Sequence, residues 1–211
     1  MNRLIVNKLR AAHHNTSLTE ISTMLDNFGR HGLNNAPWIS YPYKPKVEFS
    51  IAHAADSIYL KYYVNEKSIR AAAGSVNGNV WEDACVEFFI SFDASGYYNL
   101  EFNCIGTTLA GFGTDRNNRE LLPAALISNI RYQSLIRNEA DNTTHWELTL
   151  AIPLQMFAYH HISSLDGIEC KVNFYKCGDK LPDPHFISWN IIESDQPDFH
   201  LQQFFGTLVF E

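Results

Sequence analysis

Hydrophobic and polar residues alternate with a period of two along much of this chain, which is typical of β-strands that bury one face. In residues 85–92, Val86 and Phe88 point to one side and Glu87 to the other, with Phe89 as an apolar exception on the polar side. This alternation predicts about nine strands, at 47–51, 58–64, 85–92, 97–104, 130–136, 146–152, 172–175, 186–191 and 204–210.

One helix is predicted near the N-terminus. Ser17 and Glu20 have the spacing of a capping box, and apolar residues then recur at helical spacing until Gly29 and Gly32. We expect an accessory helix within residues 17–32. Short strands and long loops favour an all-β fold, an antiparallel β-sandwich of the jelly-roll or immunoglobulin-like kind. The sequence shows no repeat or linker, so we expect one domain spanning residues 1–211.

Charge and hydropathy exclude two classes of partner. The formal net charge is −7 and no Lys/Arg cluster is present, which argues against nucleic acid as a partner. No apolar run approaches the roughly 20 residues that span a bilayer, so we expect no membrane insertion. The N-terminus is too polar for a signal peptide. We expect a soluble protein, cytoplasmic if Met1 is the native start and periplasmic or extracellular otherwise; the sequence leaves its oligomeric state open.

The four cysteines, Cys85, Cys104, Cys170 and Cys177, match neither a zinc-binding nor a C-x-x-C redox spacing. Cys85 and Cys104 fall on opposite faces of their predicted strands, which disfavours a bridge between them. We therefore expect free, mostly buried thiols.

Several strands carry polar residues on the side away from the predicted core. They are Glu87; Asn99, Glu101 and Asn103; Lys171, Asn173 and Tyr175; and Tyr59, Lys61 and Tyr63. If these strands share one sheet, the residues form a platform of hydrogen-bonding groups flanked by Trp81. Sugars need this combination, because hydroxyls pair with carboxylates and amides while C–H faces pack on rings. The alternative is an ordinary solvated sheet face that needs no ligand.

Six segments together resemble the family 9 carbohydrate-binding modules and their DOMON-like relatives. They are W-E-D-A-C-V-E-F-F-I-S-F (81–92), Y-Y-N-L-E-F-N-C-I-G (97–106), W-E-L-T-L-A-I-P (146–153), V-N-F-Y-K-C (172–177), F-I-S-W (186–189) and P-D-F-H-x3-F-F-G-T-L-V-F (197–210). The resemblance runs from about Phe49 to the C-terminus.

The resemblance implies a β-sandwich that holds a sugar, typically a chain end, between two aromatic side chains. Trp81 and Trp189 match the ring pair, and Glu87 matches a hydroxyl-binding carboxylate. Glu101 and Asn103 stand where the family has basic residues. With Asn173 and Tyr175 from the polar face, these complete the predicted ligand-binding set. The family often carries a structural calcium ion, whose ligands cannot be matched here; we expect no other cofactor.

Three alternatives to non-catalytic carbohydrate binding follow from the same residues. A protein-interaction or structural sandwich predicts that Trp81 and Trp189 are buried or far apart. A glycosidase would use Glu87 and Glu101 as paired carboxylates. A haem or metal site would draw on the nine histidines, but the adjacent pairs His13–His14 and His160–His161 do not form H-x-H or H-E-x-x-H motifs.

Overall fold

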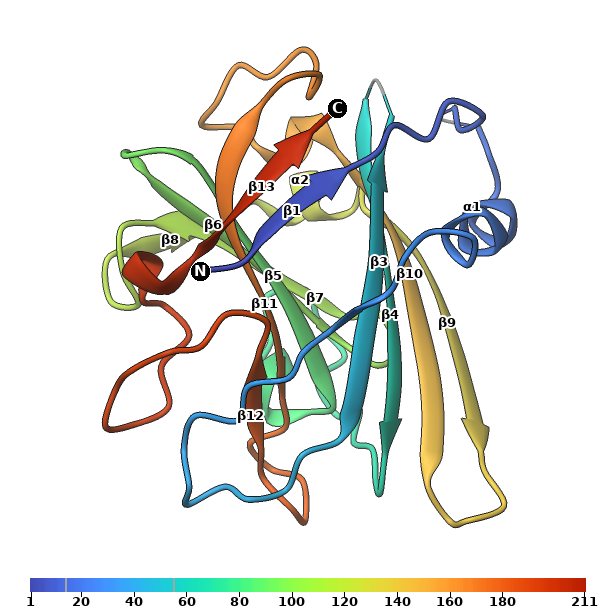
Figure 1. The fold of residues 1–211 in the computed structure, drawn as a ribbon, viewed down its shortest axis with the longest axis vertical. Helices are drawn as coiled ribbons and strands as arrows, with labels where there is room; N and C mark the ends of the chain where they lie inside the picture. Colours follow the sequence, from blue (N-terminus) through green and yellow to red (C-terminus); the bar gives the residue numbers. More distant parts are fainter. Residues whose placement is uncertain (14, 55) are drawn as a thin grey trace.

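The computed structural model describes residues 1–13, 15–54 and 56–211, which form two β-sheets packed face to face (Figure 1). His14, half of the pair His13–His14, lies outside these residues. The first sheet contains β1 (Arg3–Val6), β13 (Gly206–Phe210), β11 (Glu169–Cys177), β5 (Cys85–Asp93), β6 (Gly96–Asn103), β7 (Thr108–Gly113) and β8 (Arg119–Leu121), in that order, with β12 (Phe186–Ser188) paired to β11. The second contains β2 (His31–Gly32), β3 (Lys46–His53), β4 (Ser57–Glu66), β10 (Thr144–Pro153) and β9 (Arg131–Asn138). The predicted β-sandwich is confirmed.

Within the described residues, the named strands pair antiparallel except that β1 lies parallel to β13. The glycines of the segment 106–118 predict a loop, and this prediction is wrong: β7 forms within the segment, and β8 follows directly. Gly111 lies so close to Asn99 on β6 that an added Cβ would meet the Asn99 Oδ1 atom at 2.8 Å. Its glycine therefore permits close strand packing.

Helix α1 (Leu18–Leu25) begins at the predicted capping box. The Ser17 hydroxyl accepts a hydrogen bond from the Glu20 amide (3.2 Å), and the Glu20 carboxylate accepts one from the Ser17 amide (3.0 Å). The helix ends at Leu25, earlier than Gly29. Neither α1 nor the one-turn α2 (Ala124–Ile127) is long and apolar enough to cross a membrane, as judged over the described residues.

Part of the predicted polar platform belongs to the second sheet. Lys61 and Tyr63 lie on β4 beneath α1, where both donate hydrogen bonds to the Asp26 carboxylate at 2.7 Å. Tyr59 packs in the apolar cluster under the same helix. These three side chains therefore hold α1 to the sheet and do not share a face with Glu87.

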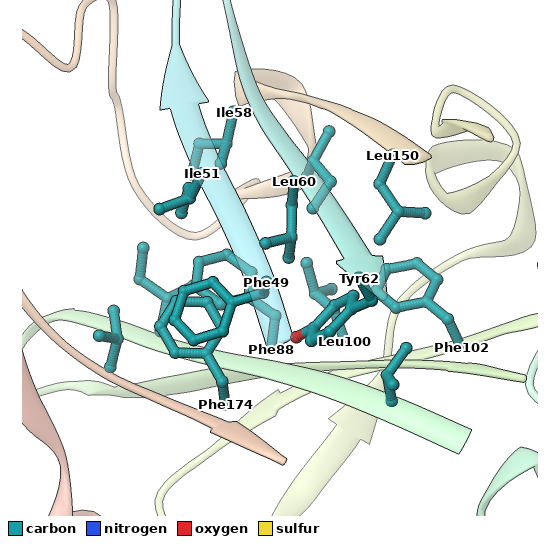
Figure 2. Close-up of a cluster of buried hydrophobic side chains, with 14 of the residues drawn as sticks. Phe49, Ile51, Ile58, Leu60, Tyr62, Phe88, Leu100, Phe102, Leu150 and Phe174 are labelled. Carbon is teal, nitrogen blue, oxygen red and sulfur yellow. The ribbon is translucent and has the colours of Figure 1, made fainter. Parts of the chain in front are cut away.

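The main core fills the space between the sheets (Figure 2). Phe174 on β11 is stacked against Phe49 on β3, with ring centroids 3.9 Å apart, and against Phe88 on β5 at 5.1 Å. Trp146 heads the alternating apolar residues of strand 146–152, which predicts a core position. It is fully buried and donates its indole hydrogen to Glu66. The aromatic stack joins the two sheets at their centre.

Replacing Phe174 with alanine should lower the free energy of unfolding by about 3–5 kcal/mol, because it empties the centre of this stack. Urea unfolding of the purified variant measures the change. Ile39→Ala is the control, since Ile39 is 95% exposed and its loss should change stability by no more than about 0.5 kcal/mol. Equal effects of the two substitutions would contradict the assigned core.

Candidate functional site

The outer face of the first sheet is covered by loops, so the predicted solvated platform is not found. Glu87, Glu101, Asn103, Asn173 and Tyr175 are each at most 3% exposed. A second apolar cluster forms over this face from sheet and loop residues: Trp38, Val80, Cys85, Phe89, Tyr97, Leu109, Tyr175, Cys177, Ile192, Phe199 and Phe205. The loops that precede β3 and follow β12 supply its outer half, and sequence alternation cannot show that they fold back. Phe89 is apolar because it packs in this cluster.

One cavity of about 470 Å³ remains between the sheet and these loops. This volume is within the range of small-molecule binding sites. The lining residues are Tyr41, Trp81, Glu87, Glu101, Arg116, Asn117, Arg119, Cys177, Asp179, Phe186, Gln196, Pro197, Asp198, Phe199 and His200. Aromatic rings and groups of both charges therefore meet in one space.

Glu87 and Glu101 form the floor of the cavity. They are direct cross-strand partners on β5 and β6, which places their side chains next to each other. The Glu87 carboxylate accepts a hydrogen bond from the Cys177 thiol at 3.2 Å, and Glu101 accepts one from the Asn99 amide at 2.9 Å. Arg119 on β8 lies 3.6 Å from Glu101.

Burial raises the pKa of both floor carboxyls. For Glu87 the nearby Glu101 carboxylate raises the pKa further, well above the ordinary value of 4.5. For Glu101 the Arg119 guanidinium opposes the effect of burial, and the pKa is raised less strongly. Both carboxyls therefore hold their protons more readily than an ordinary glutamate does.

Arg119 and Arg116 bring positive charge to the cavity. The family resemblance places such basic residues at the positions of Glu101 and Asn103 instead. Both arginines come from the segment 114–121, outside the matched motif. Arg119 also lies 3.3 Å from His200 Nε2, while His200 Nδ1 is 2.6 Å from the Tyr97 hydroxyl. Burial lowers the pKa of His200 to about 3, helped by the two arginines, so the imidazole is neutral at pH 7. The place of His200 before the last strand favours a residue that fixes a turn over a ligand contact, but His200 lines the cavity.

Trp81 is half-buried and lines the cavity from a short 3-10 helix, Val80–Glu82, that precedes β5. Asp83, which directly follows this 3-10 helix, holds it in place. Its fully buried carboxylate accepts hydrogen bonds from the Ala72 and Ala73 amides at 3.0 and 2.9 Å. The same carboxylate also pairs with Arg70. The W-E-D sequence therefore combines a half-buried ring with the carboxylate that anchors its turn.

Three predicted site residues, Asn103, Asn173 and Tyr175, do not line the cavity. The Asn103 amide donates to Asp83 (3.0 Å) and accepts from Thr107 (2.9 Å). Asn173 accepts a hydrogen bond from the Asn190 amide at 2.9 Å. Tyr175 donates to the Phe199 carbonyl at 2.9 Å and stacks on its ring at 4.2 Å. Their polar groups position the turn and loops around the cavity.

The expected pairing of Trp81 with Trp189 is not found. Trp189 is 6% exposed and belongs to the main core, where its ring meets Phe174 edge-on at 5.6 Å. The alternation 186–189 directs Trp189 inward while Phe186, three residues earlier, lines the cavity. Tyr41 packs edge-on against Phe186 at 4.7 Å. Tyr41 and Phe186 therefore supply the aromatic surface that was assigned to Trp189.

No strand or helix pattern predicts that the cavity is lined by Tyr41, Arg116, Asp179 and Asp198, because these residues lie on loops. One signal did point to Arg119: two carboxylates on one face need a positive charge nearby, and Arg119 pairs with Glu101. Among the described residues, the one cluster of three or more His, Cys, Asp or Glu side chains placed for a metal is Cys85, Glu87 and Cys177. Its two sulfur donors do not suit calcium, which prefers oxygen. The expected structural calcium stays a prediction.

Three comparisons place the chain among known proteins. The model of carbohydrate-binding family 9 matches residues 19–210. A candidate carbohydrate-binding protein from Bacteroides uniformis has 39% sequence identity and a TM-score of 0.91, with 99% of each chain covered. No curated protein sequence matches the chain.

Two further structures share the fold at low identity. They are of a family 9 carbohydrate-binding module from Caldicellulosiruptor kristjanssonii, one in complex with glucose and one with cellotriose. Each structure has 12% sequence identity to this chain and a TM-score of 0.58. The alignments cover 100% of this chain in both cases, 96% of the chain in the glucose complex and 94% of the chain in the cellotriose complex.

Replacing Glu87 with glutamine should stabilise the protein at alkaline pH but not near pH 4. A carboxyl whose pKa is raised by folding binds its proton more tightly in the native state, so stability falls as pH rises from about 4.5 through the raised pKa. Glutamine does not ionise, so the variant keeps its free energy of unfolding as pH rises. The difference in free energy of unfolding between the variant and the unaltered protein, measured with urea, should therefore grow with pH. Glu169→Gln, at an exposed ion pair with Arg3, is the control and should show little such trend.

Replacing Asp83 with alanine should lower the free energy of unfolding by about 3 kcal/mol near pH 7, because two amides and Asn103 lose a buried acceptor. The pKa of Asp83 is lowered although burial opposes this, since these hydrogen bonds outweigh desolvation. Its contribution is therefore present above about pH 3.8 and is lost below it. Glu169→Ala should cost no more than about 1 kcal/mol in the same unfolding measurement.

Proposed function

We propose that this chain, which belongs to carbohydrate-binding family 9, binds a sugar or the end of an oligosaccharide in the cavity beneath Trp81 without transforming it. The observation that carries the proposal is the buried floor of Glu87 and Glu101, with Arg119 beside it and a half-exposed indole above. The glucose and cellotriose complexes of the Caldicellulosiruptor module support a neutral glucose-type ligand.

The cavity offers each kind of contact that a sugar needs. Hydroxyl groups can donate to the floor carboxylates and accept from the Arg119 guanidinium, and such charge-assisted hydrogen bonds are stronger than neutral ones. The rings of Trp81, Tyr41 and Phe186 offer flat surfaces for the C–H faces of a pyranose. Trp81 takes the role of the first clamp ring in this proposal, and Tyr41 with Phe186 replaces Trp189 as the second.

The position of the carboxyls favours binding over hydrolysis. Glycosidase carboxyls flank the scissile bond from two sides. Glu87 and Glu101 instead rise from neighbouring strands of one sheet and lie on the same side of the cavity. This geometry supports two hydroxyl contacts to one edge of a sugar. The turnover of oligosaccharides by purified protein, abolished in Glu87→Gln, would overturn the non-catalytic proposal.

The competing interpretation, a protein-interaction sandwich without a small ligand, expected Trp81 and Trp189 to be buried or far apart. Trp189 meets that expectation. Trp81 does not, because it is half-buried at a cavity that also contains ionisable groups and two other rings. A buried polar cavity costs stability, which a ligand-binding role explains and a purely structural role does not.

Titration calorimetry with glucose and cellotriose, followed by a panel of other mono- and oligosaccharides, tests this proposal. We expect saturable binding, with an affinity about five- to tenfold weaker in Trp81→Ala and in Glu101→Gln, since each loses a contact worth about 1–1.5 kcal/mol. Tyr132→Ala and Glu169→Gln are matched controls, because both residues are exposed and neither lines the cavity. No heat with any sugar, or equal losses in the controls, would count against it.

A further inference from the structure

Two thiols and a carboxylate meet beneath the cavity. Cys85 and Glu87 are two residues apart on β5 and so share a face of the sheet. Cys177 on β11 is the direct cross-strand partner of Cys85. The two sulfur atoms and a Glu87 oxygen all lie within 4.8 Å of one another, and Cys177 Sγ is 3.2 Å from Glu87 Oε1. All three side chains are at most 3% exposed.

This donor set matches the preferences of zinc. Zn²⁺ binds thiolates at about 2.3 Å and carboxylate oxygens at about 2.0 Å in a tetrahedron, which places ligand atoms about 3.5 Å apart. The triangle formed by Cys85, Glu87 and Cys177 needs only small side-chain shifts to reach that spacing. Glu87 and Cys177 also line the cavity, whereas Cys85 lies behind them. A fourth coordination position would therefore face the cavity.

A bound cation would have to offset the cost of ionising these buried donors. Burial raises the pKa of the Cys85 thiol to about 11 and raises the pKa values of Cys177 and Glu87 as well. The charged groups that act on the cluster are Glu101 on β6, Arg119 on β8, Asp179 after β11 and Lys176 on β11. A divalent cation would offset the cost of ionising all three donors, and their protons would pass to solvent.

We propose that Cys85, Glu87 and Cys177 form a binding site for a thiophilic divalent cation such as Zn²⁺, with three protein ligands and one position open to the cavity. The site differs in chemistry from the oxygen-liganded calcium that the family resemblance implies. It does not depend on sugar binding.

Titrating the reduced protein with Co²⁺, in the absence of sugar, tests this site. Reduction comes first, because facing cysteines on paired strands are also placed for a disulfide that would remove both donors. We expect one Co²⁺ per chain, sulfur-to-cobalt charge-transfer absorption and the visible bands of a tetrahedral centre. Added Zn²⁺ should displace Co²⁺ and abolish these bands. Binding should release protons and tighten as pH rises.

Four variants assign the ligands. Cys85→Ser and Cys177→Ser should each weaken binding by about 100-fold or more, because each removes a ligand itself, and loss of a residue that only supports a ligand already costs about 10- to 100-fold. Glu87→Gln should weaken binding but keep the charge-transfer bands. Cys170→Ser is the matched control, since Cys170 is a buried thiol on the same strand β11 and packs in the main core instead. It should bind as the unaltered protein does.

The proposal fails if the unaltered reduced protein shows no charge-transfer absorption, a result that requires no variant to fold. It also fails if the bands survive in both cysteine variants or disappear equally in Cys170→Ser. Far-ultraviolet circular dichroism identifies any variant that has lost its fold, and the unaltered protein then decides the result. Because only metal is added, none of these outcomes depends on whether the cavity binds sugar.

Discussion

Both faces of the first sheet have to be covered, and the rest of the molecule follows from this constraint. Strand β5 lies near the centre of that sheet, and its alternating side chains enter two different cores. Phe88 stacks on Phe174 between the sheets, while Phe89 packs under the loops on the other side. The loops that cover Phe89 also enclose the cavity. The site is therefore the part of the outer face that the loops leave open.

Enclosure changes the chemistry of the polar residues on this face. In water, Glu87 and Glu101 would be two ordinary carboxylates on a wet sheet. Under the loops, burial and mutual repulsion raise their pKa values, and Arg119 and the Cys177 thiol become significant partners. Low exposure strengthens each of these interactions, because little water competes for the groups. The cavity therefore gathers a small number of strong polar contacts in one space.

Residues that do not line the cavity maintain its shape. Asp83 gathers the turn that presents Trp81, and Asn103 connects that turn to β6. Tyr175 holds the loop around Phe199 against the sheet. These side chains have the polar character expected of ligand contacts, and sequence reasoning therefore assigned two of them to the site. Their hydrogen bonds go to the protein itself.

The sequence by itself determined the sandwich, most of its strands and the capped helix. It also assigned Trp81, Glu87 and Glu101 to one region. These features could be predicted because strand periodicity and local motifs are encoded by neighbouring residues. Only the tertiary structure decided that β4 lies in the other sheet, that Trp189 faces the main core, and that Arg119 and Tyr41 reach the cavity. It likewise placed Cys85 opposite Cys177. Each of these facts depends on which distant segments pack together, and a one-dimensional pattern of polar and apolar residues does not specify that packing.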